Sequence, residues 1–193
     1  MKISILGASG FIGSHLYNHL TENHLSDFTT VGTYYSNPKC DLTFLDMTEK
    51  NQIEKYLLVS RPDYIIILTG SKDVKKCEED YTFSYNINTK PIKNIIQVIT
   101  KNSIKTKLIF ISTDYVFSGE NGQYKSDSKP NPTTNYGRSN LLSEKLLFKS
   151  NIDYKILRTG AVMGNGAIFY DWLISSLKED NKISLFDNVF YTP

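Results

Sequence analysis

Short apolar runs alternate with longer amphipathic stretches along this chain of 193 residues. Six runs of four or five residues, rich in apolar and β-branched side chains, have the length and composition of strands: residues 2–6, 29–33, 41–45, 64–68, 107–111 and 154–157. Five stretches have helical periodicity: residues 11–20, 49–60, about 78–101, about 134–148 and 169–178. This alternation predicts an α/β fold of the Rossmann type, a doubly wound parallel sheet with helices on both faces.

Individual residues give finer expectations within these elements. Thr48 is placed to cap the second predicted helix, and Pro91 is expected to kink the long third one. A last short apolar run covers residues 183–186. In the fourth predicted helix, the residues expected to face the sheet are Leu141, Leu142 and Leu146.

Three glycines directly follow the first predicted strand, at Gly7, Gly10 and Gly13. Strand, glycine turn and helix in this order are what a dinucleotide site requires. Gly7 lets the chain turn off the strand, Gly10 lets the backbone approach a pyrophosphate, and Gly13 lets the helix pack closely. The helix N-terminus adds unpaired N–H groups and a positive dipole end for the phosphates. The simpler alternative is a turn that happens to be rich in glycine; the place of the motif at the first strand favours a cofactor site.

The carboxyl ends of the first four predicted strands carry Gly7, Tyr34, Asp46 and Thr69-Gly70. Because ligands of such sheets bind outside the carboxyl ends of the strands, these residues are expected to line one crevice. An acidic residue at the end of the second strand would favour NAD by accepting a hydrogen bond from the ribose 2′-hydroxyl. None is present there; no arginine is present to clamp a 2′-phosphate either, although Lys39 is expected to be able to reach one. NADP is therefore slightly favoured, with NAD left open.

The composition is that of an ordinary globular chain and argues against several classes of function. Lys and Arg number 22 against 20 Asp and Glu, and this net charge of +2 does not favour nucleic-acid binding. Cys40 and Cys77 lack metal or redox spacing, and His15 and His19 lack a third ligand, so no metal site is predicted. No apolar run is long enough to span a membrane, and unpaired cysteines fit a reducing compartment. These features predict a cytoplasmic protein with no membrane partner.

Further motifs lie in the second half of the chain: Ser112-Thr-Asp-Tyr-Val-Phe117, Asn135-Tyr-Gly-Arg-Ser139 and Ser143-Glu-Lys145. Together with the glycine loop they resemble the extended short-chain dehydrogenase/reductases, and within these the dTDP-4-dehydrorhamnose reductases. The same pattern is matched by Asp46-Met-Thr-Glu49, Arg61-Pro-Asp63, Asn88, and Leu185-Phe-Asp187 with Thr192-Pro193. The resemblance implies reduction of the 4-keto group of a deoxy-sugar nucleotide with NADPH or NADH.

The resemblance also implies roles for particular residues. Tyr136 would protonate the carbonyl oxygen as hydride arrives, and Thr113 would hydrogen-bond that oxygen. The third catalytic residue of the family is a lysine four positions after the tyrosine, which holds the nicotinamide ribose and lowers the pKa of the tyrosine; here Asn140 takes that position. The implied cofactor-binding residues are Gly7, Ser9, Gly10, Phe11, Ile12, Gly13, Tyr34, Asp46, Met47, Thr69, Gly70, Asn88 and Tyr136.

Asn140 changes the expected chemistry of Tyr136. A free tyrosine has a pKa of about 10, which is poorly matched to proton transfer at neutral pH. Asn140 brings no charge to correct this, and the helical neighbours Ser139 and Ser143 are uncharged as well. Loss of a positioned acid–base partner commonly lowers a rate by about 100- to 10,000-fold. The sequence therefore predicts impaired or absent catalysis.

The chain is expected to form a single NAD(P)-binding domain over residues 1–193, with the beginning of a substrate lobe near residues 160–193. Most of the substrate lobe that the family carries is expected to be missing. Three functions stay open: a reductase-like protein with a nucleotide-sugar substrate, a non-catalytic dinucleotide-binding or regulatory protein, and a remnant that folds and binds nothing. The second is the condition of the regulatory beta subunit of methionine adenosyltransferase, which the same family includes. A homodimer or a regulatory partner is left open.

Overall fold

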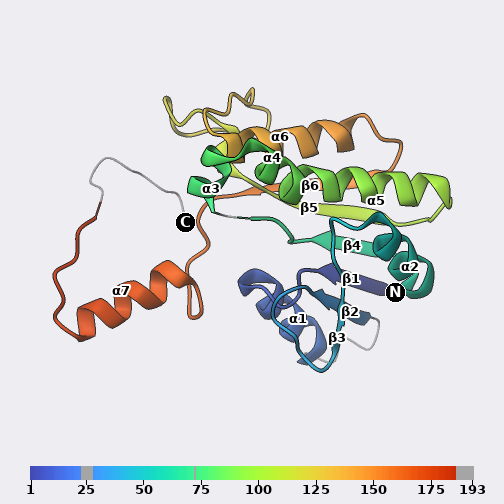
Figure 1. Ribbon diagram of the computed structural model, residues 1–193, viewed down its shortest axis with the longest axis horizontal. Helices are drawn as coiled ribbons and strands as arrows, with labels where there is room; N and C mark the ends of the chain where they lie inside the picture. Colours follow the sequence, from blue (N-terminus) through green and yellow to red (C-terminus); the bar gives the residue numbers. More distant parts are fainter. Residues whose placement is uncertain (23–27, 72, 186–193) are drawn as a thin grey trace. The chain divides into compact units, whose positions relative to one another are not determined.

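The computed structural model describes residues 1–22, 28–71 and 73–185 of the chain (Figure 1). Six strands form one sheet in the order β3-β2-β1-β4-β5-β6. Their bounds are β1 Lys2–Leu6, β2 Thr29–Tyr34, β3 Leu42–Phe44, β4 Tyr64–Ile67, β5 Lys107–Thr113 and β6 Asp153–Thr159. The pairs β1–β2, β2–β3, β1–β4 and β4–β5 are parallel, so the carboxyl ends of these strands meet at one edge of the sheet. The strand order reverses beside β1, where ligands of such sheets bind.

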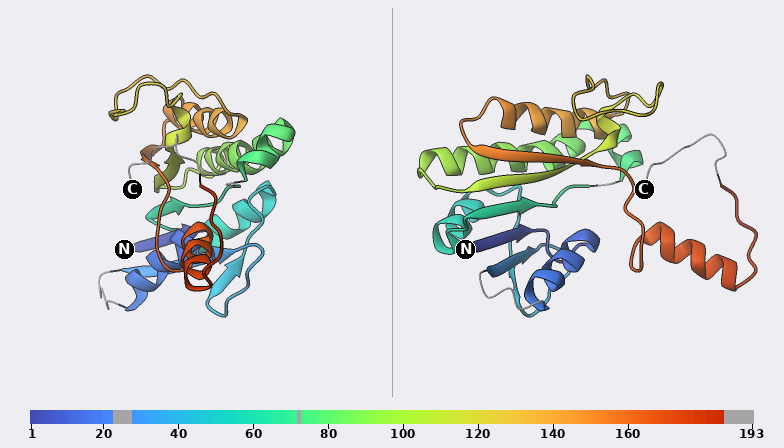
Figure 2. Two further views of the ribbon diagram at one scale, coloured as in Figure 1. Left: turned by 90° about the vertical axis from the view of Figure 1, so that its left-hand side faces the viewer. Right: turned by 180° about the vertical axis from the view of Figure 1, so that it is seen from behind.

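Helices cover both faces of this sheet (Figures 1 and 2). The helical elements are α1 Phe11–Glu22, α2 Lys50–Ser60, α3 Val74–Glu79, α4 Tyr81–Ser84, the π-helical turn η1 Tyr85–Thr89, α5 Lys90–Lys101, the 3₁₀ turn η2 Asp114–Val116, α6 Asn135–Phe148 and α7 Ile168–Lys178. Strand β4 shows how the core is divided: Ile65 and Ile67 pack into the cluster under α2 and α5, whereas Ile66 packs into the cluster under α1. Burial on both faces explains the continuous apolar sequence of β4. The Rossmann-type fold predicted from the sequence is confirmed.

The strands were predictable from the sequence, since each lies within two residues of the bounds that its apolar run indicates. The long helix predicted over residues 78–101 is wrong. Asp80 is extended (φ −139°, ψ 98°) and its side chain accepts a hydrogen bond from the backbone N–H of Phe83, while Asp73 caps α3 in the same way through Lys76. Aspartate favours such caps over a helix interior because its side chain competes for backbone N–H groups.

Pro91 lies in the first turn of α5, directly after the π-helical turn η1, and helical backbone runs without a break from Tyr81 to Lys101, so the kink expected at Pro91 stays a prediction. The backbone N–H of Lys90, the residue before Pro91, is bonded to the carbonyl oxygen of Tyr85 five residues back, which is the π-helical pattern. The π-helical turn η1 directly precedes α5 and joins it to the short helices α3 and α4. The chain therefore reaches α5 through three short helical pieces.

Two other local predictions are corrected. Thr48 does not cap α2: its N–H and its hydroxyl both donate to Oδ1 of Asp46, and the cap residue is Glu49, which makes no side-chain cap bond. On α6, Leu147 is fully buried, whereas Leu146 and Leu142 are only half-buried.

Residues 183–185 form no strand. Residue 186, the end of the predicted apolar run, lies outside the described residues, as do residues 187, 192 and 193 of the family motifs.

The chain forms two compact units, Met1–Arg158 and Thr159–Pro193. The first contains the sheet and the helices up to α6. In the second, α7 buries Ser176, while its apolar residues Ile168, Phe169 and Trp172 are exposed. The expectation of a substrate lobe that begins near residues 160–193 stays a prediction. In the described part of the chain, no helix combines the length and apolarity that crossing a membrane requires.

Candidate functional site

The glycine turn has the geometry that its sequence predicts. Gly7 has φ +90°, a conformation that side chains disfavour, and its N–H donates to the hydroxyl of Thr33 at the end of β2 (3.1 Å). A Cβ atom at Gly13 would lie 2.1 Å from the carbonyl oxygen of Gly7, so a side chain there would push α1 off the turn. The first turn of α1 is thereby held directly beside the end of β1, with its N–H groups near the carboxyl edge of the sheet.

Gly13→Ala is expected to lower the free energy of unfolding by about 1–3 kcal/mol, because the added methyl group must displace backbone rather than a flexible side chain. Gly10→Ala is the matched control: its Cβ would meet only the oxygen of Gly7, at 3.3 Å. Urea unfolding of both variants without added ligand measures the difference. Equal stability of the two would show that α1 can move away from the turn at little cost.

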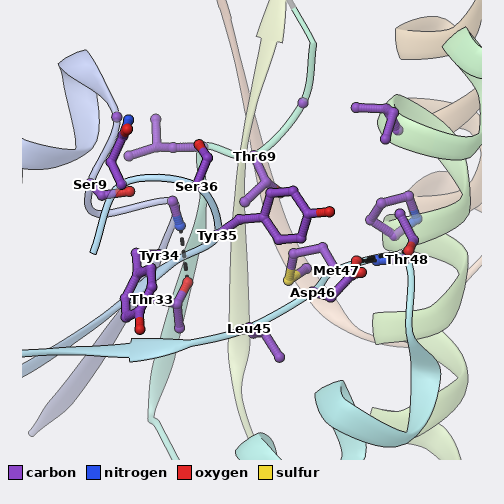
Figure 3. A pocket seen from close by; sticks show the side chains of 17 residues that line it. Ser9, Thr33, Tyr34, Tyr35, Ser36, Leu45, Asp46, Met47, Thr48 and Thr69 are labelled. Atoms are coloured by element: carbon purple, nitrogen blue, oxygen red, sulfur yellow. Dashed lines mark hydrogen bonds between the residues drawn. The ribbon is translucent and has the colours of Figure 1, made fainter. Parts of the chain in front are cut away.

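A cavity of about 280 Å³ opens beside the glycine turn (Figure 3). Eight of the residues that the sequence assigns to cofactor binding line it: Gly7, Ser9, Gly10, Tyr34, Asp46, Met47, Thr69 and Gly70. The other lining residues were missed: Thr33, Tyr35, Ser36, Asn37, Leu45, Thr48, Leu68, Ile87 and Pro91. Most of these directly flank a predicted strand end, so extending each strand end by a few residues would have found them. Ile87 and Pro91 reach the cavity only through tertiary packing.

The cavity wall contains a polar atom that fits a ligand site. The hydroxyl of Thr69 is buried and has no hydrogen-bond partner among the described residues. Buried polar atoms are almost always paired, so a ligand in the cavity with a polar group at this position would complete the pairing. Together with the glycine turn, this atom makes the wall suitable for a phosphate- and ribose-bearing ligand.

Five predicted cofactor-binding residues are not part of the cavity wall. Phe11, Ile12 and Gly13 form the first turn of α1, and Tyr136 lies on α6. Asn88 is buried, and its Oδ1 accepts from the backbone N–H of Ser71, next to the wall residue Gly70. Asn88 therefore holds the loop after β4 in place from outside the cavity. Cofactor contacts of these five residues stay predictions.

A buried polar cluster fixes α6 against η1 and α4. The Ser139 hydroxyl is bonded to the Ser84 hydroxyl (2.9 Å) and to the Asn88 amide (3.2 Å). Thr89 donates to the carbonyl oxygen of Ser139 (2.8 Å), and Ser143 donates to that of Asn88 (2.9 Å). Ser139 and Ser143 thus serve the packing of α6, which carries Tyr136 and Asn140. The hydrogen bonds from Ser71 to Asn88 and from Asn88 to Ser139 of α6 connect the loop beside the wall residue Gly70 with the helix of the predicted acid.

Thr113 and Tyr136 are brought together as the sequence predicts. Thr113 ends β5 and Tyr136 lies in the first turn of α6, whose N-cap is Thr134. The hydroxyl of Thr113 donates to Oδ1 of Asp114 (3.2 Å) and accepts from the N–H of Tyr115 (3.2 Å). It lies close enough to Tyr136 to lower the pKa of that phenol. The ring of Tyr115 meets that of Tyr136 edge-on at 5.5 Å between centroids. The phenol is therefore held beside a hydroxyl at the carboxyl end of a central strand.

Burial raises the pKa of Tyr136 above its ordinary value of 10.0; the nearby hydroxyl of Thr113 lowers it, and the charge of Asp114 raises it further. Among the described residues, no lysine or arginine contributes to this pKa. Asn140 is buried and its amide donates to the backbone carbonyl of Tyr136 (2.9 Å), back along the helix. The phenol is accordingly a protonated, weak acid at neutral pH.

Sequence analysis gave no role to the buried carboxylate of Glu144. Its side chain is 0% exposed and forms a bidentate pair with Arg158 of β6 (Nε–Oε1 3.0 Å, Nη2–Oε2 2.7 Å). Ser112, the neighbour of Thr113, donates to the same carboxylate (2.7 Å). These bonds raise the pKa of Arg158 above its ordinary value. The pair ties α6, β5 and β6 together two turns beyond Tyr136, and Glu144 lies inside the quoted Ser143-Glu-Lys145 motif.

Comparisons with known proteins agree with this geometry. The family model described as RmlD substrate binding domain matches residues 1–193. Methionine adenosyltransferase 2 subunit beta of Xenopus tropicalis is 25% identical over 188 residues, which cover 97% of this chain and 52% of that protein. The chain thus spans about half the length of the curated relatives it matches.

Two solved structures show the same fold. A hypothetical dTDP-4-dehydrorhamnose reductase from Sulfolobus tokodaii has a TM-score of 0.83 and 34% identity, covering 95% of this chain and 64% of its own. The dTDP-4-dehydrorhamnose reductase of Bacillus anthracis, solved in complex with NADP, has a TM-score of 0.82 and 27% identity, covering 94% of this chain and 61% of its own.

Proposed function

The chain belongs to the family described as RmlD substrate binding domain, and from this premise we propose that it binds a nicotinamide dinucleotide and acts in nucleotide-sugar metabolism as a reductase-like protein. The observation that carries the proposal is the cavity beside the glycine turn, with Gly7 and Gly10 on its wall and the N-terminus of α1 next to it. The NADP bound by the Bacillus anthracis relative supports the same ligand class here.

The residues beyond the cavity support a carbonyl reduction of modest rate. When bound, the dinucleotide would supply the hydride. Thr113 would hydrogen-bond the 4-keto oxygen of a deoxy-sugar nucleotide, and Tyr136 would give that oxygen its proton. The first residue is buried at the end of β5 and the second is half-buried at the start of α6, so both are fixed before a substrate arrives. Asn140 provides no charge to assist the proton transfer.

The proposal is tested by titrating the purified chain with NADH and with NADPH, following the fluorescence of the reduced nicotinamide. We expect saturable binding that Gly10→Val weakens by at least about tenfold, since a side chain at Gly10 would occupy the wall where a pyrophosphate approaches. Thermal unfolding of the variant checks that its fold is kept. If neither nucleotide binds, the proposed function is wrong.

A second candidate, a non-catalytic dinucleotide-binding or regulatory protein, is favoured by the side chain of Asn140, which is folded back onto the carbonyl of Tyr136. The similarity to a regulatory subunit, methionine adenosyltransferase 2 subunit beta, supports it. This candidate predicts normal nucleotide binding, no turnover with a 4-keto-6-deoxy sugar nucleotide, and a partner protein that co-purifies with the chain. Turnover by the natural chain would decide for the reductase.

A further inference from the structure

The segment that follows β2 forms part of the cavity wall. Tyr35, Ser36 and Asn37 line the cavity and are exposed to solvent. Figure 3 shows the ring of Tyr35 directed toward the side where Asp46 and Met47 lie. The same ring stacks on Phe44 of β3 (6.0 Å between centroids, 26° between planes), which defines its position. In this topology, the end of β2 is where the adenosine ribose of a dinucleotide lies.

The described wall of the cavity carries no positive charge. Of the 17 residues that line it, none is lysine, arginine or histidine, and the one carboxylate is that of Asp46. Lys39, the basic residue nearest to the segment in sequence, is exposed and is not part of the wall. The amine of Lys50 is bonded to Gln97 (2.8 Å). A phosphate group at the end of β2 would therefore meet neutral side chains and one negative charge.

This lining is expected to bind NAD and NADP with different affinities. A 2′-phosphate brings about 1.5 to 2 negative charges at neutral pH, and these would find no ion-pair partner among the described residues of the wall. A ribose 2′-hydroxyl is neutral, and the hydroxyl of Ser36 and the amide of Asn37 supply both donors and acceptors for it. The absence of a carboxylate at the end of β2 removes one favourable contact for NAD. The absence of a cation removes the ion-pair partner of the 2′-phosphate, which is the larger loss because a phosphate carries full negative charge and a hydroxyl is neutral.

This inference rests on the nicotinamide site proposed above. We infer that this chain prefers NAD(H) over NADP(H), and that residues 35–37 set the preference because none of them is a cation that could pair with a 2′-phosphate. This inverts the slight preference for NADP that the sequence alone suggested. It also names Ser36 as the position from which specificity can be changed, because its side chain lines the cavity and is exposed.

The test compares the dissociation constants of NADH and NADPH for the natural chain, for Ser36→Arg and for the neutral control Ser36→Gln. NADH is expected to bind the natural chain at least about tenfold more tightly than NADPH. Ser36→Arg is expected to tighten NADPH about tenfold, with NADH changed by less than about threefold, since a guanidinium pairs bidentately with phosphate. The gain should shrink at high salt, and Ser36→Gln should leave the ratio within about threefold of its original value.

The outcomes separate this inference from the proposed function. Equal or tighter binding of NADPH by the natural chain overturns the preference but leaves the nicotinamide site in place. A ratio that Ser36→Arg does not shift overturns the role of residues 35–37. Binding of neither nucleotide overturns the proposed function itself.

Discussion

Asn140→Lys is expected to raise the rate of 4-keto reduction by about 100- to 10,000-fold over the natural chain. Asn140 lies one helical turn after Tyr136, and its amide reaches only the backbone carbonyl of that residue. A lysine side chain is longer and carries a positive charge, which favours the ionised phenol and so lowers the pKa of Tyr136. A stronger acid at this position transfers its proton more readily to the developing alkoxide. Thr113, which is proposed to hydrogen-bond the same oxygen, lies beside Tyr136.

The pH profile distinguishes this effect from a general repair of the site. Reduction requires the protonated phenol, so activity falls as pH rises through the pKa of Tyr136, which burial holds above 10.0 in the natural chain. The added cation should move this high-pH limb to lower pH. Asn140→Gln, neutral and of intermediate length, should change neither rate nor limb, and Tyr136→Phe should abolish the gain of Asn140→Lys. Normal NADH binding without any gain in turnover would favour the non-catalytic candidate.

Glu144→Gln is expected to lower the free energy of unfolding by about 3–5 kcal/mol, which corresponds to roughly 6–20 °C in Tm for a chain of this size. The substitution keeps the shape of the side chain but leaves the guanidinium of Arg158 without its carboxylate. Glu144 is fully buried, so water cannot enter at this position to solvate the guanidinium of Arg158 in place of the lost carboxylate charge. The amide also offers Ser112 one oxygen acceptor instead of a shared carboxylate.

Glu79→Gln is the matched control, because Glu79 faces Lys75 on the surface of α3, with both side chains largely exposed. It should leave the unfolding curve almost unchanged. Replacing both Glu144 and Arg158 by methionine should recover much of the loss, since a buried pair exchanged as a whole avoids an unpaired charge. Denaturant unfolding followed by circular dichroism measures all three. Equal stability of Glu144→Gln and Glu79→Gln would contradict the account of the buried pair.

Much of the framework can be predicted from local sequence because its determinants are local. A run of five residues, three of them apolar, followed by a glycine turn already specifies β1 and the start of α1, since a sharp turn and a close helix each require glycine at Gly7 and Gly13. The prediction that Thr113 and Tyr136 lie together rested on the family resemblance and not on periodicity. In the structure, β5 and α6 place the two side chains together. In both cases the sequence motif itself defines the geometry.

Other features depend on contacts between residues far apart in the chain. The break at Asp80 in the helix predicted over residues 78–101 is an exception, because its cap acts over only three residues while the helical periodicity continues through the break. The burial of Glu144 follows from Arg158 on β6 and Ser112 on β5, and no local pattern distinguishes it from an exposed glutamate. The cavity wall likewise joins Ser36 with Pro91, which packing alone brings together. The sequence by itself determined the strands and the glycine turn, because hydrophobic period and turn chemistry act over a few residues. Only the tertiary structure decided which charged side chains are paired and which are not, because the partner of a buried charge can come from a residue far away in the chain.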